Sequence, residues 1–224
     1  IGDPLDMIAS GPAYPDSSTS AEALAIVQKY GLRITEEVER LLRIDPPTAL
    51  ENVTTKITGS VRQLCLAAEK TCRELGYTPI ILTDSLTCEA REAGSFLAAI
   101  ARYHADTGQS LAFIAGGETV VHVKGQGKGG RNQELALAAA EGISNLDRVA
   151  LFSVGSDGTD GPTDAAGGYV DNDTKRKLGE VGISIHQALE NNDSYHALKA
   201  VDGLIFTGPT GTNVNDLSVL LIKR

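Results

Sequence analysis

Hydrophobic and polar positions alternate with two different periods along the first half of the chain. Short runs rich in β-branched and apolar residues predict strands at 53–58, 78–83 and 111–115. Apolar positions three and four residues apart predict helices between them, at 60–75 and 89–106. Because strands separated by helices of this length usually pair through right-handed crossovers, the sequence predicts an α/β fold. We expect a largely parallel or mixed sheet with helices on both faces.

The second half of the chain continues this alternation. It predicts strands at 119–124, 149–154, 204–207 and 217–222, and helices at 131–142 and near 173–179. Three glycine-rich polar loops lie next to these strands, at 125–130, 155–168 and 208–216. In open α/β sheets, the loops at the carboxyl ends of the strands gather in one crevice, where ligands usually bind. We therefore expect one crevice to hold all three loops.

The first 47 residues have a different pattern. Residues 1–16 contain three prolines, two glycines and three aspartates, which predicts an extended loop with turns. Two short helices follow, one after the capping box Thr19–Glu22 and one from Thr35, before a boundary at Pro46–Pro47. Apolar side chains in the opening loop suggest packing against an upstream lobe. We predict an arm with two helices at 1–47, continuing from a missing N-terminal lobe, and an α/β domain at 48–224.

Composition and charge narrow the classes of protein. With 224 residues, 42% of them hydrophobic and 22% charged, the chain has the composition of a soluble globular protein. The net charge of −9 argues against nucleic acid as a partner, because phosphate-backbone binding needs a basic face. No apolar stretch is long enough to span a bilayer. The three cysteines form no zinc or disulfide pattern, so we expect a reducing cytoplasm.

The loop at 125–130 is the first candidate binding site. It lies before a helix that opens at Arg131, and free N–H groups at a helix start favour an anion. Lys124 and Lys128 add positive charge. Three of the glycines also satisfy G-x-G-x-x-G, but the acidic residue that would hold a dinucleotide ribose about 20 residues on is absent, since Asp157 comes late. A tight turn without any ligand remains the alternative.

Three aspartates in the next glycine-rich loop are the second candidate. Asp157, Asp160 and Asp164 together suit a hard cation such as Mg²⁺, which takes one or two carboxylates with phosphate oxygens and water. The alternative is that these aspartates cap turns, which Asp before Gly or Thr often does. Asp157 is the strongest of the three because it directly follows a buried strand.

Four segments together resemble the MOFRL domain of the glycerate 2-kinase family. They are G-G-E-T-V-V from Gly116, G-K-G-G-R-N-Q-E-L-A-L from Gly127, S-D-G-T-D-G-P-T-D-A-A-G from Ser156 and G-P-T-G-T-N-V-N-D from Gly208. The opening I-G-D-P-L-D-M-I-A-S-G-P looks like the stretch that leads out of the family's N-terminal lobe. The resemblance implies transfer of the γ-phosphoryl group of ATP to the 2-hydroxyl of D-glycerate.

The resemblance also implies a set of site residues. Arg131 and Asp157 match the family's active-site arginine and aspartate, and we expect both to handle charge in catalysis rather than to support the fold. We expect substrate or phosphate to bind at Gly117, Glu118, Gly127, Lys128, Gly129, Gly130, Asn132, Thr212 and Asn213, and metal at Asp157, Asp160 and Asp164. A family lysine and an aspartate of the N-terminal lobe have no counterpart here. We therefore expect the chain to supply only part of a site and to be inactive alone.

Two alternatives to a kinase stay open. Relatives are often labelled hydroxypyruvate reductase, which would require NAD(P)H, although the ribose acid and an obvious hydride-transfer His/Arg pair are missing. The chain is alternatively a non-catalytic, anion-binding fragment. The expected partners are glycerate and the N-terminal lobe, with no nucleic acid and no membrane, and a homodimer is left open.

Overall fold

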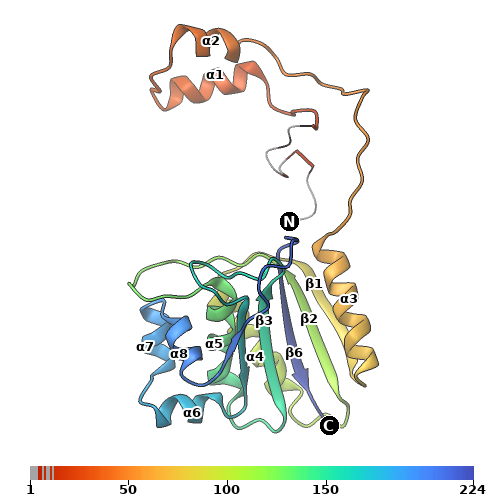
Figure 1. Ribbon diagram of the computed structural model, residues 1–224, viewed down its shortest axis with the longest axis vertical. Helices are drawn as coiled ribbons and strands as arrows, with labels where there is room; N and C mark the ends of the chain where they lie inside the picture. The colour runs from red at the N-terminus through yellow and green to blue at the C-terminus, as the bar shows by residue number, and fades with distance from the viewer. Residues whose placement is uncertain (1–4, 7, 9–10, 12) are drawn as a thin grey trace. The chain divides into compact units, whose positions relative to one another are not determined.

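A computed structural model describes residues 5, 6, 8, 11 and 13–224 (Figure 1). The chain divides into two compact units, residues 2–58 and 59–224, which are described separately below. The loop predicted at 1–16 lies partly outside the described residues. The division falls after Thr58, later in the chain than the boundary predicted at Pro46–Pro47.

The smaller unit contains α1 (Ser20–Lys29) and α2 (Glu36–Leu42). The predicted capping box of α1 is formed, with Thr19 and Glu22 each bonding the other's backbone, and Thr35 caps α2 through the N–H of Val38. The strand predicted at 53–58 is wrong. Residues 51–58 are exposed and, among the described residues, no strand pairs with them, so their β-branched side chains have no sheet face on which to pack.

The larger unit is built on one six-stranded sheet with the order β1-β2-β6-β3-β4-β5. Its strands are β1 (Thr78–Leu86), β2 (Leu111–Gly117), β3 (Val149–Gly155), β4 (Gly167–Asp171), β5 (Leu204–Ile205) and β6 (Asp216–Ile222). Only β1 and β2 pair in parallel, and every other neighbouring pair is antiparallel. The prediction of a mixed sheet is confirmed, whereas a largely parallel one is wrong. The crossovers do align β1, β2 and β3, but the last strand inserts between β2 and β3 in the opposite direction.

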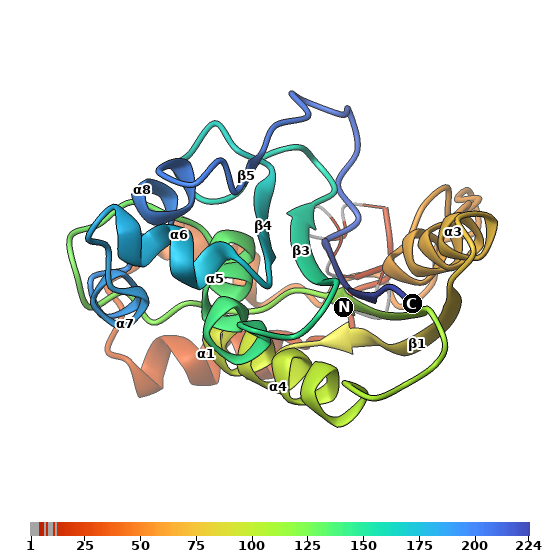
Figure 2. The same ribbon diagram turned by 90° about the horizontal axis from the view of Figure 1, so that it is seen from below.

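Helices cover both faces of the sheet, as predicted. On one face, α3 (Val61–Glu74) packs Val61, Cys65 and Cys72 against apolar residues of β2 and β6. On the other face, α4 (Ala90–Tyr103) and α5 (Arg131–Ile143) form the larger core with β2, β3, β4 and β6. Figure 2 shows α3 on the opposite side of the sheet from α4 and α5. In a sheet that is covered by helices, ligands usually bind at the ends of the strands.

Three short helices complete this unit beside α5. They are α6 (Thr174–Glu180), α7 (Ile185–Glu190) and α8 (Ser194–Lys199). The sequence predicts the first and misses the other two, because each has only six residues and so shows too little periodicity. None of the helices in the described part of the chain has the length and apolar character that a membrane-spanning helix needs.

The strand predicted at 119–124 is also wrong. The strand β2 ends at Gly117, whose φ of 150° turns the chain, and a Cβ at this position would lie 2.3 Å from the carbonyl oxygen of Leu86. Beyond this turn the chain leaves the sheet and makes only an isolated bridge between Val120 and Glu89. The alternation at 119–124 therefore belongs to an extended segment that lines a cleft rather than to a strand.

The end of the sheet gathers the polar loops. Asp216, the first residue of β6, pairs with Gly117 of β2 on one side and with Gly155 of β3 on the other. The chain after β2, the chain after β3 and the chain before β6 therefore start from one edge. This arrangement brings the three loops to one edge of the sheet, with the first turn of α5 beside them; that one crevice holds all three stays a prediction.

Candidate active site

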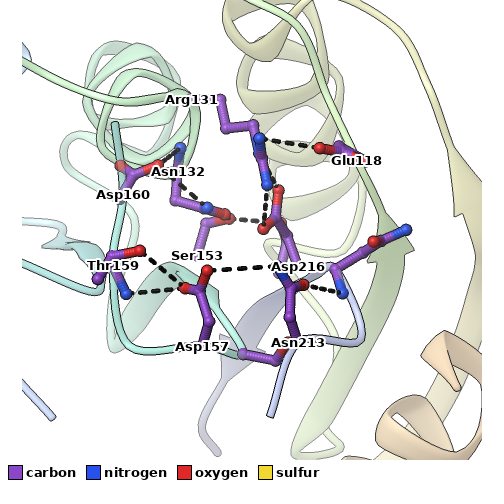
Figure 3. Close-up of polar contacts among 12 residues, drawn as sticks. Glu118, Arg131, Asn132, Ser153, Asp157, Thr159, Asp160, Asn213 and Asp216 are labelled. Carbon is purple, nitrogen blue, oxygen red and sulfur yellow. Dashed lines mark hydrogen bonds and ion pairs between the residues drawn. The ribbon is translucent and has the colours of Figure 1, made fainter. Parts of the chain in front are cut away.

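The site is centred on the Arg131 guanidinium, which is bound by two carboxylates (Figure 3). Its Nε and Nη2 donate to the two oxygens of Asp216 at 2.5 and 3.0 Å, which is a bidentate pair. Its Nη1 forms an ion pair with Glu118 at 3.0 Å. The hydrogen bonds that Arg131 donates to Asp216 raise the pKa of Arg131 further above its usual range, so the guanidinium stays charged.

The two carboxylates differ in how firmly they are held. The Asp216 side chain is 8% exposed and starts a central strand, whereas the Glu118 side chain is 45% exposed. Sequence reasoning missed Asp216 as a site residue and treated it only as the end of a loop. The signal was an acidic residue immediately before the apolar run of a predicted strand, since such a residue is costly to bury unless it is paired.

Asp160 caps α5 from outside the helix. Its two carboxylate oxygens accept the N–H groups of Asn132 at 3.1 Å and Gln133 at 2.9 Å, together with both side-chain amides. Burial raises the pKa of Asp160, which is 2% exposed. A Cβ on Gly130 would lie 2.3 Å from this carboxylate, so only glycine fits there. These hydrogen bonds make Asp160 a capping residue. Capping was the alternative to its predicted role as a metal ligand.

Asn132 does not face the crevice. Its side chain is buried, donates to Asp160 and accepts the hydroxyl of Ser153 at 2.5 Å, and Ser153 in turn contacts Ser218 at 2.8 Å. This chain of bonds ties α5 to β3 and β6 beneath the site. Both polar atoms of the Asn132 side chain therefore have protein partners, and binding of substrate or phosphate at Asn132 stays a prediction without support from this geometry.

Most of the glycine loop is not free to bind an anion. The N–H groups of residues 124 and 125 donate to Asn192 Oδ1 at 2.8 and 3.0 Å, and those of 126 and 127 donate to side-chain and backbone oxygens of Asn191. The N–H of Lys128 donates to Asp193 at 2.9 Å. The N–H groups of 125–128 are thus already bonded within the protein, and binding of phosphate at Gly127 stays a prediction. Within the described part of the chain, the N–H groups of 129, 130 and 131 have no hydrogen-bond partner.

Lys128 and Asp164 meet at Tyr195 and not at Arg131. The Lys128 ammonium lies 4.4 Å from the centre of the Tyr195 ring, and the Tyr195 hydroxyl donates to Asp164 at 2.8 Å. This hydrogen bond lowers the pKa of the exposed Asp164 carboxyl. Among the described residues, no group of three or more His, Cys, Asp or Glu side chains is placed to hold a metal ion. The three aspartates of the loop therefore serve three different partners.

Asp157 lies at the crevice and keeps one oxygen nearly free. Its Oδ1 accepts the N–H and hydroxyl of Thr159 at 2.9 and 3.0 Å, while Oδ2 accepts only a 3.3 Å bond from the exposed Asn213 amide (Figure 3). Thr212 is exposed beside Asn213. Asp157 and Asn213 thus lie together as the sequence suggests, at the same sheet edge as Arg131.

A cleft of about 520 Å³ opens next to Arg131. Its apolar wall is the extended segment after β2 together with Pro162, and its polar lining includes Glu118, Gly127, Gly129, Gly130, Arg131, Glu134 and Asn192. Residues 129–131, whose N–H groups have no partner among the described residues, belong to this lining. The cleft therefore offers a cation and backbone donors on one side and an apolar surface on the other.

Asn192 and Glu134 line the cleft and are held in place by contacts with each other and with neighbouring segments. Asn192 Nδ2 donates to Glu134 Oε2 at 3.2 Å and to the carbonyl of His122 at 3.4 Å. Glu134 is 2% exposed and lies 3.4 Å from Arg91 Nε. Burial raises the pKa of the Glu134 carboxyl. Sequence reasoning missed this network because its members come from α4, α5 and the segment before α8.

The chain is similar to known proteins along its whole length. Residues 111–216 match the MOFRL family, and residues 1–43 match a domain of unknown function, DUF4147. Over 99% of its length the chain is 52% identical to a D-glycerate 2-kinase of Thermotoga maritima and 36% identical to a putative hydroxypyruvate reductase of Agrobacterium vitis. It covers 54% and 52% of those proteins, so it spans about half the length of the curated relatives it matches.

A solved structure extends the likeness to three dimensions. The crystal structure of a glycerate kinase from Thermotoga maritima matches with a TM-score of 0.94 at 52% identity, covering 99% of this chain and 54% of that one. The chain is thus similar over 99% of its own length to glycerate kinases that are about twice as long, and residues 111–216 match the MOFRL family.

Proposed function

We propose that this chain is part of a D-glycerate 2-kinase, which transfers the γ-phosphoryl group of ATP to the 2-hydroxyl of D-glycerate. The observation that carries the proposal is the 52% identity to a D-glycerate 2-kinase over 99% of the chain, including the loops around Arg131. The chain covers 54% of that protein. The remaining lobe is the partner that we propose completes the site.

In this proposal Arg131 supplies positive charge and Asp157 orients the acceptor hydroxyl. A guanidinium beside the unpartnered N–H groups of 129–131 stabilises negative charge that develops on a phosphoryl group. Asp157 Oδ2 has one weak protein partner and is therefore available to accept a hydrogen bond from substrate. Thr212 and Asn213 add neutral donors at the rim.

The donor set near Asp157 fits Mg²⁺ only as a site of one carboxylate completed by phosphate oxygens and water, which is a common arrangement for this ion. Asp157 would hold it, since Asp160 and Asp164 are bonded elsewhere. A bound Mg²⁺ supplies neutralisation of the phosphate charge. Asp157 itself contributes a carboxylate held in place by Thr159.

A hydroxypyruvate reductase is the second candidate, because the Agrobacterium vitis relative carries that name. The structure gives it less support. A dinucleotide would need the N–H groups of the glycine loop for its pyrophosphate, and those of residues 125–128 are already bonded to Asn191–Asp193.

An assay of a protein of the relatives' full length distinguishes the two. With D-glycerate and ATP, we expect ADP release and a phosphorylated product whose phosphorus NMR spectrum identifies the 2-position. With hydroxypyruvate and NADH or NADPH, we expect no oxidation of the cofactor. Reductase turnover without phosphorylation would reverse the proposal, and phosphorylation at the 3-position would correct its regiochemistry.

A further inference from the structure

We propose that the Glu118 carboxylate is a displaceable cover on Arg131: it is paired with Arg131 Nη1 in the absence of ligand, and the anionic group of the ligand takes its place. Asp216 remains bound to Arg131 throughout. The inference rests on the proposed function in taking phosphate or carboxylate as the ligand class. It adds a role for Glu118 as a competitor of the ligand, in place of its predicted role as a direct binding residue.

The division of Arg131 donors between the two carboxylates carries the first step. Asp216 accepts from both Nε and Nη2 and is 8% exposed, so its release would leave a buried charge without a partner. Glu118 takes only Nη1 and its side chain is 45% exposed, so water replaces the contact at little cost. The ligand can therefore replace Glu118 at Arg131 Nη1, whereas Nε and Nη2 stay bound to Asp216.

The backbone at Glu118 is fixed, which leaves only its side chain to move. The N–H of Glu118 donates to the carbonyl of Leu86 at 2.8 Å, and the preceding Gly117 packs against the backbone of Leu86. Thr119, on the other side, is buried. Rotation of an exposed glutamate side chain on a fixed backbone is a fast and inexpensive motion.

The charges around Arg131 explain why the Glu118 side chain must move away before an anion binds. Among the residues that the structure describes, Arg131 is the one cation in contact with the carboxylates of Glu118 and Asp216, and Asp160 adds negative charge at the start of the same helix. An anion that approached while all three carboxylates stayed in place would meet net negative charge. Once the Glu118 side chain rotates away, Arg131 Nη1 becomes available in the cleft that residues 129–131, with their unpartnered N–H groups, also line.

Titration of the 224-residue chain with inorganic phosphate tests this inference, followed by NMR of the backbone amides and of the arginine Nε–H groups. We expect Glu118→Gln to bind phosphate about threefold more tightly than the unchanged chain, as loss of one exposed ion pair implies. The matched control is Glu180→Gln, which removes the same charge from an exposed pair with Arg176 at 2.7 Å on α6. We expect the control to leave phosphate affinity unchanged, and Arg131→Gln in the Glu118→Gln background to abolish the gain.

Each other outcome overturns the inference. Equal or weaker binding by Glu118→Gln would show that Glu118 does not compete, and an equal gain in both glutamine variants would reduce the effect to net charge. No binding by any variant, or a large loss of unfolding free energy in Glu118→Gln, would also refute a displaceable cover. Phosphate binding to this chain needs no catalysis. A failed kinase assay would therefore contradict the proposed function without affecting the conclusion about Glu118.

Discussion

At the scale of single residues, Arg131 has two roles: it lines the cleft, and it holds the buried carboxylate of Asp216. The sequence predicts only the first. The glycine loop and the family motif predict its place in the crevice. They do not predict that two of its donor atoms hold the buried carboxylate of Asp216. The structure therefore adds a contribution to stability that was not expected for a residue thought to act only in catalysis.

We predict that Arg131→Lys impairs both tasks. A lysine keeps the charge but offers no planar fork, so it cannot bind both Asp216 oxygens and also face the cleft. The free energy of unfolding of the 224-residue chain should fall by about 1–2 kcal/mol, as measured by urea denaturation. Turnover of the full-length enzyme should fall by about two to three decades, which corresponds to ~3–4 kcal/mol of barrier.

The control for that variant is Arg176→Lys, which alters an exposed arginine paired with Glu180 on the surface of α6. It should change the free energy of unfolding by less than about 0.5 kcal/mol and leave turnover unaltered. If Arg131→Lys behaved like Arg176→Lys in both measurements, the bidentate contact would have neither role.

Short-range sequence signals account for the residues on α5 and at the loop starts. Arg131 and Asp157 stand beside glycines at the ends of apolar runs, so local pattern and motif together place them at the crevice. Asp216, Asn192 and Glu134 were not predicted. Their partners lie 85, 68 and 58 residues away along the chain, and no local pattern encodes such a pairing.

At the scale of elements, the glycine loop depends on the short segment between α7 and α8. Asn192 has a φ of 52° and its side chain accepts the N–H groups of Lys124 and Gly125 while donating to His122 and Glu134. The sequence shows only a run of polar residues there. The element that shapes the loop is therefore remote from it in the chain.

We predict that Asn192→Gly loosens this loop. Glycine adopts the positive φ without strain, so the change removes the side-chain hydrogen bonds and the contacts of a buried side chain while the backbone stays in place. The free energy of unfolding should fall by about 1–3 kcal/mol, because buried donors and acceptors lose their partners. The amides of Lys124 and Gly125 should exchange with solvent faster in hydrogen-exchange measurements.

Asn145→Gly is the matched control, since Asn145 also has a positive φ, of 65°, but is exposed. Any effect of glycine on the flexibility of the unfolded chain is shared by the two variants. The difference between them therefore measures what the buried Asn192 side chain contributes through its hydrogen bonds and packing. Indistinguishable unfolding and exchange in the two variants would show that the loop holds its shape without this side chain.

At the scale of the whole molecule, periodicity predicts the layers of the larger unit but not the order of its strands. The α/β class and the helices on both faces follow from the alternation of strands and helices. The antiparallel insertion of β6 between β2 and β3 is a long-range pairing, set by burial of its apolar side chains on both faces of the sheet. That insertion places Asp216 between the ends of β2 and β3, and so it creates the centre of the site.

The last prediction concerns the activity of the chain by itself. We predict that the 224 residues alone do not phosphorylate D-glycerate. The chain covers 54% of the Thermotoga maritima D-glycerate 2-kinase. Its crevice offers one arginine already paired with two carboxylates, and the nearby Lys128 lies over Tyr195. Transfer of a phosphoryl group requires more positive charge than this, normally from several cationic groups around the phosphates.

The measurement compares ADP release by three samples. They are the 224-residue chain alone, a protein as long as the relatives, and the chain mixed with the remaining lobe as a separate polypeptide. We expect activity in the second sample, partial recovery in the third and none in the first. Reactions without D-glycerate control for contaminating ATPase activity. Appreciable phosphorylation by the chain alone would show that Arg131, the N–H groups of 129–131 and Asp157 form a complete site, and that the other lobe contributes binding or regulation rather than charge.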